Sequence, residues 1–210
     1  RQPARSNATG KKTREDIVQL SIPLFAQSGF DGISMRDIAA AVGVTPSALY
    51  HHFRDKDSLY LEVIGRTFTE KTAGLQQILS AGGDPHERLE KFIGAFVRIL
   101  GEEKDFQRLL HWTLLESTDA RMQALADDVF LDLVCHVERL VRELQLAYDP
   151  ILLTVSIMGM VMFPFEAAKA ATHIPGHRAA HARPAVLAKH IVQLLRNGIG
   201  APAADSPATS

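Results

Sequence analysis

Helix-capping and helix-ending residues follow one another closely in the first quarter of the chain. Ser34 stands three residues before Asp37, which is the spacing of a capping box, and Gly43 supplies a stop. Thr45 can cap another helix, and the proline after it fits the first turn, where a missing N–H costs nothing. The pattern therefore predicts two short helices joined by a tight turn, which is the helix-turn-helix arrangement.

Helical spacing of apolar residues continues along the rest of the chain, and strand-like alternation does not persist anywhere. Ile17, Leu20, Leu24 and Phe25 form one apolar stripe, in which Pro23 is expected to bend the helix without breaking it. We therefore expect an all-α fold of about nine helices. The expected helices cover residues 13–28, 35–42, 46–52, 56–79, a stretch that begins at 85, 105–115, 119–147, 150–171 and 184–197.

The basic side chains are unevenly placed, although the net charge is only -1. Residues 1–14 carry five basic side chains and no acidic one. Residues 1–60 carry eight basic and six acidic side chains, whereas the remaining 150 carry 15 and 18. The N-terminal part is therefore the candidate for contact with a polyanion. We expect its first residues to be either a solvated leader or an arm that follows DNA phosphates or the minor groove.

Residues 14–64 resemble the DNA-binding region of the TetR family of transcriptional regulators. The matching stretch reads LFAQSGFDGISMRDIAAAVGVTPSALYHHFRDKDSLYLEVI. The positions that carry the resemblance are the Gly29–Phe30 step, Ser34, Ile38–Ala39, Gly43–Val44, Leu49–Tyr50, Phe53, Lys56 and Leu59. Beyond this region the chain resembles the family only in its length and helical character.

The resemblance implies a homodimer whose two recognition helices enter successive major grooves of a palindromic operator. It also implies a larger C-terminal domain that binds a small, largely apolar molecule and thereby releases the operator, so that the protein is a repressor. The corresponding divisions are a flexible basic arm (1–12), a helix-turn-helix DNA-binding domain (13–56), a ligand-binding and dimerisation domain (57–199) and a disordered tail (200–210). The helix from residue 56 is the expected connector between the two domains.

The resemblance also assigns DNA contacts to positions in and around the two short helices. These positions are Ser34, Met35, Arg36, Thr45, Pro46, Ser47, Ala48, Tyr50, His51 and Lys56. We expect Tyr50, Lys56 and the Ser34 hydroxyl to hold phosphates, and Arg36 to contact either phosphate or base. The side chains expected to face the bases are Thr45, Ser47, Ala48 and His51.

Aromatic and methionine side chains in the C-terminal two thirds are candidates for an apolar ligand site, together with a few polar groups that would orient the ligand. The candidates are Phe92, Phe96, His111, Trp112, Leu115, Glu116, Met122, Phe130, Met158, Met162 and Phe163. For each apolar residue, simple core packing is the alternative.

The helices expected at about 150–171 and 184–197 are the candidate dimer surface. The first carries Gly159 and several alanines, which allow close packing, and the second has an apolar stripe that includes Leu187 and Ile191. Two such helices from each subunit would make a four-helix bundle. Packing within one chain is the alternative.

Other functions find less support in the sequence. His173, His177 and His181 are spaced by four, but Pro175 and Gly176 break any helix between them, so we expect no metal site and no cofactor. The sequence contains no nucleophile elbow, phosphate loop, dinucleotide fingerprint or zinc-protease motif, so we expect no enzyme and no catalytic residue.

The sequence also allows predictions about the compartment in which the protein lies and about what controls it. Cys135 is the single cysteine, expected to be a buried inert thiol, and the absence of a disulfide fits a cytoplasmic protein. The most apolar run, 151–165, is too short to cross a membrane, and we expect a buried helix there. A protein partner in place of a small ligand is the alternative form of control.

Overall fold

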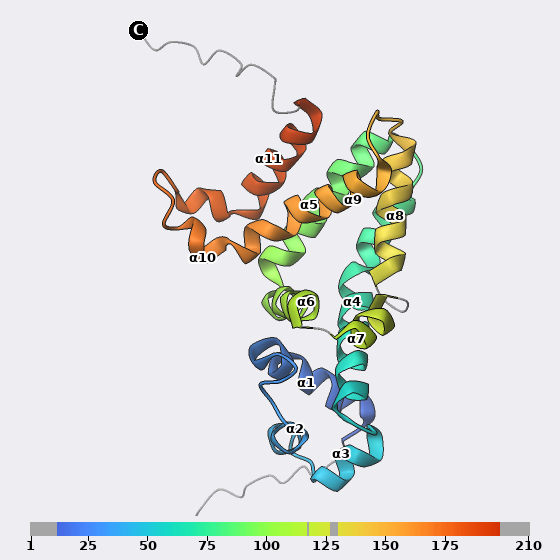
Figure 1. The fold of residues 1–210 in the computed structure, drawn as a ribbon, viewed down its shortest axis with the longest axis vertical. Coiled ribbons are helices and arrows are strands. Elements are labelled where there is room, and N and C mark those ends of the chain that lie inside the picture. Colours follow the sequence, from blue (N-terminus) through green and yellow to red (C-terminus); the bar gives the residue numbers. More distant parts are fainter. Residues whose placement is uncertain (1–11, 117, 127–129, 198–210) are drawn as a thin grey trace, which may run out of the picture.

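The helices of the computed structural model account for nearly all of the residues that it describes, which are 12–116, 118–126 and 130–197 (Figure 1). No strand occurs among these residues, which confirms the all-α prediction. The α-helices are α1 (Arg14–Ser28), α2 (Met35–Val42), α3 (Pro46–His52), α4 (Lys56–Ser80), α5 (Pro85–Glu102), α6 (Lys104–Glu116), α7 (Asp119–Leu125), α8 (Leu131–Glu143), α9 (Pro150–Glu166), α10 (Ala168–Ala171) and α11 (Pro184–Asn197). A short 3-10 helix, η2 (Ala179–Ala182), precedes α11.

The starts of the N-terminal helices follow from the residues at their caps. The Thr13 hydroxyl accepts a hydrogen bond from the backbone N–H of Asp16, and the same reciprocal box forms between Ser34 and Asp37. The Asp55 carboxylate caps α4 in the same way. Helix α1 continues through Pro23 without a break, as expected.

Helix α4 connects the two ends of the molecule. Its 25 residues correspond to a length of about 37 Å. It runs from the small N-terminal helices, at the bottom of Figure 1, into the larger helical body above them. Its packing partners include α1, α6 and α7, and also α5 and α8.

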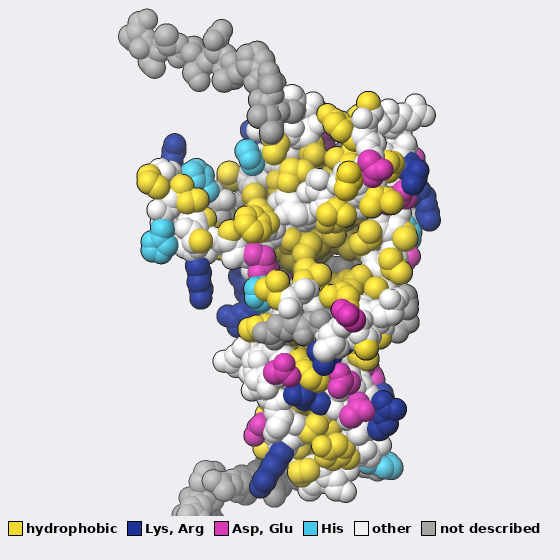
Figure 2. Space-filling model, viewed as in Figure 1, with side chains coloured by type: hydrophobic (Ala, Val, Ile, Leu, Met, Phe, Trp, Pro, Cys, Tyr) yellow, Lys and Arg dark blue, Asp and Glu magenta, His cyan; other side chains and the backbone are white. Residues whose placement is uncertain are grey.

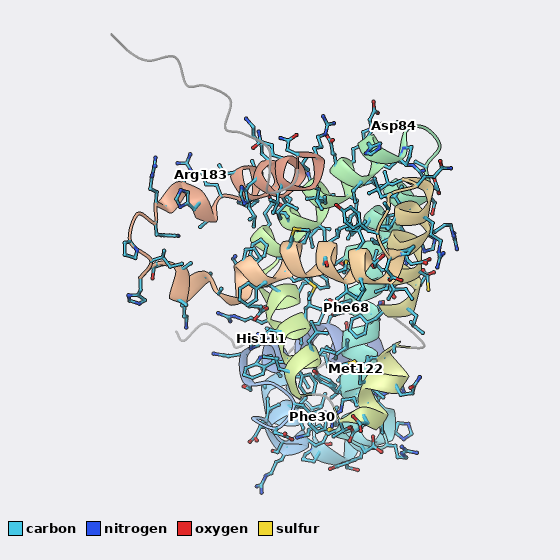
Figure 3. The ribbon with its side chains drawn as sticks, turned by 45° about the horizontal axis from the view of Figure 1, so that its top comes forward. Phe30, Phe68, Asp84, His111, Met122 and Arg183 are labelled. Carbon is cyan, nitrogen blue, oxygen red and sulfur yellow. The ribbon has the colours of Figure 1, made fainter. Side chains whose placement is uncertain are left out.

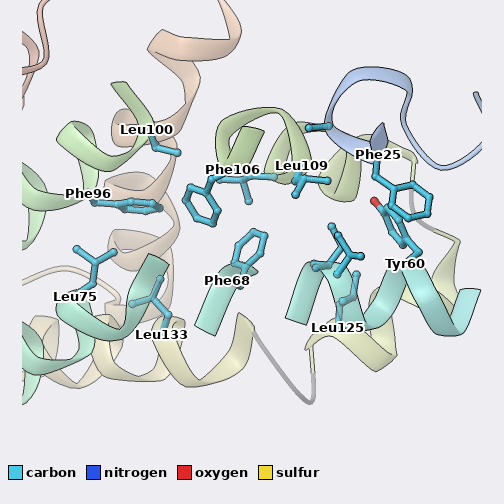
Figure 4. Close-up of a cluster of buried hydrophobic side chains, with 14 of the residues drawn as sticks. Phe25, Tyr60, Phe68, Leu75, Phe96, Leu100, Phe106, Leu109, Leu125 and Leu133 are labelled. Atoms are coloured by element: carbon cyan, nitrogen blue, oxygen red, sulfur yellow. The ribbon is translucent and has the colours of Figure 1, made fainter. Parts of the chain in front are cut away.

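One hydrophobic core runs through both ends of the molecule. Figure 4 shows it passing from Phe25 and Tyr60 at the N-terminal end, through Phe106 and Phe68, to Phe96 deep in the larger body. Because the core is continuous, the packing shows no boundary between residues 56 and 57, where the two expected domains meet. The division into two functional domains therefore stays a prediction.

The expected helix 119–147 is divided into α7 and α8. Helix α7 packs on α4 near its start, where Arg121 binds Asp57, whereas α8 also packs on α9 and bonds the far half of α4 through Gln76 and Asp132. Ala126 and Phe130, the described residues between the two α-helices, have π-helical instead of α-helical geometry. Helix α8 also ends earlier than expected, because Gln145 takes a positive φ of 50°.

The expected helix 150–171 is divided into α9 and α10. Pro164 lies in the last turn of α9, where it has no N–H to give to the preceding turn. Ala167 then leaves helical geometry, with ψ at 0°, before α10 begins. No helix among the described residues is both long and apolar enough to cross a membrane.

Candidate functional site

The turn between α2 and α3 depends on Gly43. Its φ of 77° lies in the left-handed region that favours glycine, and its N–H donates to the carbonyls of Ala39 and Ala40. The Val44 N–H donates to the Ala39 carbonyl at 2.9 Å. The turn therefore closes α2 and sends the chain directly into α3, which Thr45 caps through its hydroxyl.

Two buried anchors fix which face of α3 points outward. Leu49 and Phe53 are completely or almost completely buried in the core that α1, α2 and α4 form. The opposite face leaves the Tyr50 side chain 53% exposed, and Ser47 and His51 are exposed beside it. A short helix with an exposed polar face of this kind is suited to contacting another molecule.

Most of the positions predicted to touch DNA lie at this surface. Those whose residues are exposed are Ser34, Arg36, Thr45, Pro46, Ser47, Tyr50 and His51, and Ala48 is half-buried. Met35 differs, because its side chain packs into the core and is only 7% exposed. This leaves only the backbone of Met35, in the first turn of α2, for a contact with DNA.

Lys56 is half-buried and already makes internal hydrogen bonds. Its ammonium donates to the carbonyl oxygens of Phe30 and Ile33 at 2.8 and 3.1 Å, and lies 4.1 Å from the centre of the Phe30 ring. An ammonium has three N–H groups, so these two bonds leave one donor for a phosphate. Lys56 therefore holds the loop between α1 and α2 against α4, whatever else it binds.

Arg14 holds the end of α3 in place. Its guanidinium pairs with Glu62 of α4, donates to the His52 carbonyl and lies 4.4 Å from the centre of the Phe53 ring. This arginine therefore belongs to the folded unit and not to a free basic arm. The other basic residues of the predicted arm, apart from Lys12, fall outside the described residues, as does the predicted disordered tail.

The carboxylates of the capping boxes carry lowered pKa values. The pKa of Asp37 lies below its ordinary value of 3.8 because the carboxylate accepts hydrogen bonds from the Ser34 side chain and backbone. Hydrogen bonds from Thr13 lower the pKa of Asp16, and bonds from Ser58 and Arg54 lower that of Asp55. A carboxylate with a lowered pKa stabilises the fold above its unfolded pKa, and this contribution is lost as the pH falls through its folded pKa.

We expect Asp37→Asn to reduce the free energy of unfolding at neutral pH and to have progressively less effect below about pH 4. Urea unfolding of wild type and variant between pH 7 and 3 measures this difference. Asp31→Asn, which removes an exposed carboxylate from the neighbouring loop, is the matched control. A difference for Asp37→Asn that is the same at every pH would contradict the role of this carboxylate.

The candidate ligand residues do not gather around one cavity of the described structure. Phe92 and Phe96 are buried in the core, and Phe130 packs on Phe68. Leu115 and Phe163, in contrast, are 70% and 67% exposed. Met122, Met158 and Met162 are half-buried, and Glu116 has a side chain outside the described set.

The two remaining candidates make specific polar contacts. His111 pairs through Nδ1 with Glu166 of α9, and it projects from α6 in Figure 3. Trp112 donates its indole N–H to the Ala26 carbonyl of α1 at 3.1 Å. Both side chains therefore connect α6 to other helices. The ligand role of the whole set stays a prediction.

The contact that Arg121 makes could not be predicted from the sequence. Its side chain is 8% exposed, its Nε donates to the Asp57 carboxylate at 3.0 Å, and its guanidinium lies 3.6 Å from the centre of the Phe30 ring. Figure 3 labels Phe30 and also Met122, which follows Arg121 on α7. Arg121 thus joins α7 to the start of α4 and to the loop after α1. No cap, spacing or charge pattern distinguishes this arginine from one on a solvated helix face.

The other side chains considered from the sequence form no site. Cys135 is exposed and not buried as expected, because Leu133 and Val137 occupy the inward face of α8. The rings of His177 and His181 lie 5.5 Å apart. Among the described residues, no group of three histidine, cysteine or acidic side chains is placed to hold a metal ion.

The capped helix-turn-helix exposes a polar face, and one long helix joins it to a larger helical body. This arrangement is that of the helix-turn-helix class of proteins. Residues 17–63 match the family model described as bacterial regulatory proteins, tetR family. Over this segment the chain is similar to the TetR family, which confirms the resemblance seen in residues 14–64.

Two transcriptional regulators match about half of the chain or less. The transcriptional repressor KstR2 of Mycolicibacterium smegmatis is 38% identical over 85 residues, which are 40% of each chain. The transcriptional activator FasR of the same organism is 28% identical over 115 residues, 52% of each chain. The matches thus span only about half, or less, of these relatives. Both are transcriptional regulators and not enzymes, in agreement with the expected absence of catalysis.

Solved structures match nearly the whole chain. FadR from Bacillus subtilis, in complex with stearoyl-CoA, has a TM-score of 0.73 at 14% identity and covers 89% of this chain and 100% of its own. AibR, in complex with isovaleryl coenzyme A and operator DNA, has a TM-score of 0.65 at 22% identity and covers 86% and 96%. At these identities the likeness concerns the fold alone.

Proposed function

We propose that this protein is a dimeric transcriptional repressor that binds a palindromic operator and releases it when a small, largely apolar molecule binds the C-terminal body. The observation that carries the proposal is the exposed face of α3, fixed by the buried Leu49 and Phe53 within a segment that matches the TetR family. The repressor KstR2 supports it, and the activator FasR supports regulation of transcription in general.

In this proposal α3 enters the major groove and divides the contacts between backbone and bases. Tyr50 holds a phosphate, and the remaining N–H of Lys56 adds a charged contact. The Ser34 hydroxyl donates its single proton to Asp37, so it would have to exchange that bond to hold a phosphate as expected. Thr45 and His51 face base edges, where hydroxyl and ring nitrogen can donate or accept. Few charges lie on this face, so base contacts and close backbone approach supply most of the specificity.

The outer face of α9 supports the homodimer. Leu152, Val155, Gly159 and Phe163 follow one another at helical spacing and are all exposed. Figure 2 shows hydrophobic side chains gathered over the upper body, where α9 and α11 lie in Figure 1. An apolar stripe of this kind marks an interaction surface, and a second copy placed on a two-fold axis would cover it.

Control by a small molecule is supported by the relatives of known structure. FadR is described with stearoyl-CoA, and AibR with isovaleryl coenzyme A as well as operator DNA. Bound effector and bound DNA therefore both occur on this fold. For the present chain we propose the same pair of partners, with an effector that is largely apolar.

Selection of duplex DNA from a random pool with the purified protein tests the function. We expect a palindromic consensus, with two half-sites about one helical turn apart, bound by two copies of the chain. Recovery of no specific duplex would overturn the proposal. A consensus without two-fold symmetry would overturn the dimeric mode of binding.

Tyr50→Phe and His51→Ala are expected to differ in kind. Loss of the Tyr50 hydroxyl removes a phosphate contact and should weaken binding to every duplex by about 1 kcal/mol, or roughly fivefold. Loss of His51 should change the preferred base at one position of each half-site, at a cost of about 1–3 kcal/mol on the original operator. Repeating the selection and titrating operator against a scrambled duplex measures both effects.

His52→Ala is the matched control for His51→Ala, because His52 is the neighbouring histidine but is half-buried at the end of α3. It should leave the base preference unchanged. An altered preference in the Tyr50 variant, or an unaltered one in the His51 variant, would refute this assignment of roles.

A further inference from the structure

A cavity of about 520 Å³ lies in the larger body, at the end of the molecule away from α3. Its walls come from the first half of α5, the first half of α9, the last turns of α11 and the loop between α8 and α9. None of the residues predicted to bind a ligand lines it. We propose that this cavity is the binding site of the small-molecule effector, and that it takes a compact, uncharged, largely apolar molecule. That the ligand is an effector rests on the proposed function, whereas the ligand site itself does not.

The inner walls of the cavity are aliphatic and belong to the core. Ile93 of α5 and Ile157 of α9 are completely buried, and Leu89 and Leu144 are almost so. Leu153 is half-buried and packs against the same core. The cavity volume falls in the range of about 300–1,000 Å³ that is usual for small-molecule sites. A ligand that fills it would therefore bury apolar surface on three sides.

The charged groups at the rim already have partners. The Arg196 guanidinium pairs with Glu90 across α11 and α5. The Asp149 carboxylate accepts the backbone N–H groups of Ile151 and Leu152, at 3.0 and 2.9 Å, as the cap of α9. A charged ligand would have to break one of these pairs or bury its charge without a partner, which is costly. The rim therefore favours an uncharged ligand.

Two other side chains at the rim can form hydrogen bonds with a ligand. The His86 imidazole and the Tyr148 hydroxyl both line the cavity and can each donate or accept. They suit a hydroxyl, carbonyl or amide group at one end of the ligand. The expected ligand class is thus an aromatic or branched aliphatic molecule with one or two polar atoms.

The cavity shares a wall with the face proposed for the dimer. Leu152 and Ser156 line it and also lie on the exposed side of α9. Helix α11, which forms the opposite wall, packs along α5. A molecule held between α9 and α11 would therefore act directly on the helices that set how two subunits meet.

A pair of dyes tests both the place and the class of ligand. N-phenyl-1-naphthylamine is uncharged, whereas 8-anilino-1-naphthalenesulfonate has the same ring system with a sulfonate added. We expect the uncharged dye to bind the full-length protein with one site per chain and to gain fluorescence. The sulfonated dye should bind at least about tenfold more weakly, a difference of about 1.4 kcal/mol.

Two variants of α9 locate the site. Leu153→Phe adds a ring to a residue that lines the cavity, and should weaken binding of the uncharged dye at least about tenfold. Met158→Phe is the matched control, because Met158 is also half-buried on α9 but does not line the cavity. It belongs to the ligand set predicted from the sequence, so it also tests that rival site.

Equal loss of binding in both variants, a loss in Met158→Phe alone, or equal affinity for the two dyes would overturn the proposal. Circular dichroism of each variant shows that it is folded, and Leu195→Phe on α11 provides a second change at the same cavity. No DNA is present in the titration. A negative result in the dye titration would therefore not bear on operator binding. A negative result in the duplex selection would overturn the regulatory function but not the proposed dye site.

Discussion

Replacing Val155 and Phe163 together by glutamate is expected to produce a folded monomer whose operator affinity is at least about a hundredfold lower. Both side chains are more than half exposed on α9, so the subunit does not need them for its own core. In a two-fold interface each substitution occurs twice and places like charges near one another, which costs several kcal/mol. Loss of the second recognition helix then removes the gain from binding both half-sites at once.

Sedimentation equilibrium and operator titration measure the two parts of this prediction. Leu115→Glu is the control, since Leu115 is equally exposed but lies on α6 and not in the apolar stripe of α9. It should leave both the mass and the affinity unchanged. A double variant that remains dimeric would show that subunits meet through another surface.

Arg121→Ala is expected to lower the free energy of unfolding by about 2–3 kcal/mol. The arginine is almost fully buried between the Phe30 ring and the Asp57 carboxylate, so its removal takes away a desolvated cation–ring contact, an ion pair and packing. Arg121→Lys should recover only part of the loss, because an ammonium lacks the flat surface that stacks on the ring. Urea unfolding followed by circular dichroism measures both changes.

Arg54→Ala supplies the comparison for an arginine at the surface. The Arg54 side chain is 88% exposed and pairs with its neighbour Asp55. Its removal should leave the free energy of unfolding almost unchanged, because water screens an ion pair at the surface. If the Arg121 variant proved as stable as the Arg54 variant, α7 would not be held to the N-terminal helices by this contact.

The features that could be predicted from the sequence are those encoded by neighbouring residues. The box of Ser34 and Asp37, the left-handed Gly43 and the cap at Thr45 each act over one helical turn, so their pattern is visible without any knowledge of the fold. The anchors Leu49 and Phe53 then determine the outward face of α3. This is why the exposure of most of the predicted positions could be foreseen, apart from the buried Met35, while their contacts with DNA stay predictions.

The features that could not be predicted depend on residues far apart in the chain. Arg121 meets Asp57 across 64 positions, and nothing near either residue indicates the pairing. Aromatic residues such as Phe92 fill the core as readily as they would line a cavity, so composition alone could not separate the two roles. The cavity proposed for the effector is lined largely by aliphatic residues brought together from three helices and the loop between α8 and α9.

The indole of Trp112 gives the protein a built-in optical reporter. It is the single tryptophan of the chain, and its N–H reaches from α6 to the Ala26 carbonyl in the last turns of α1. Tryptophan emission therefore comes from a contact between the larger body and the helix that supports the DNA-reading end. A shift in that emission would follow the separation of α6 from α1 in real time, without any attached label.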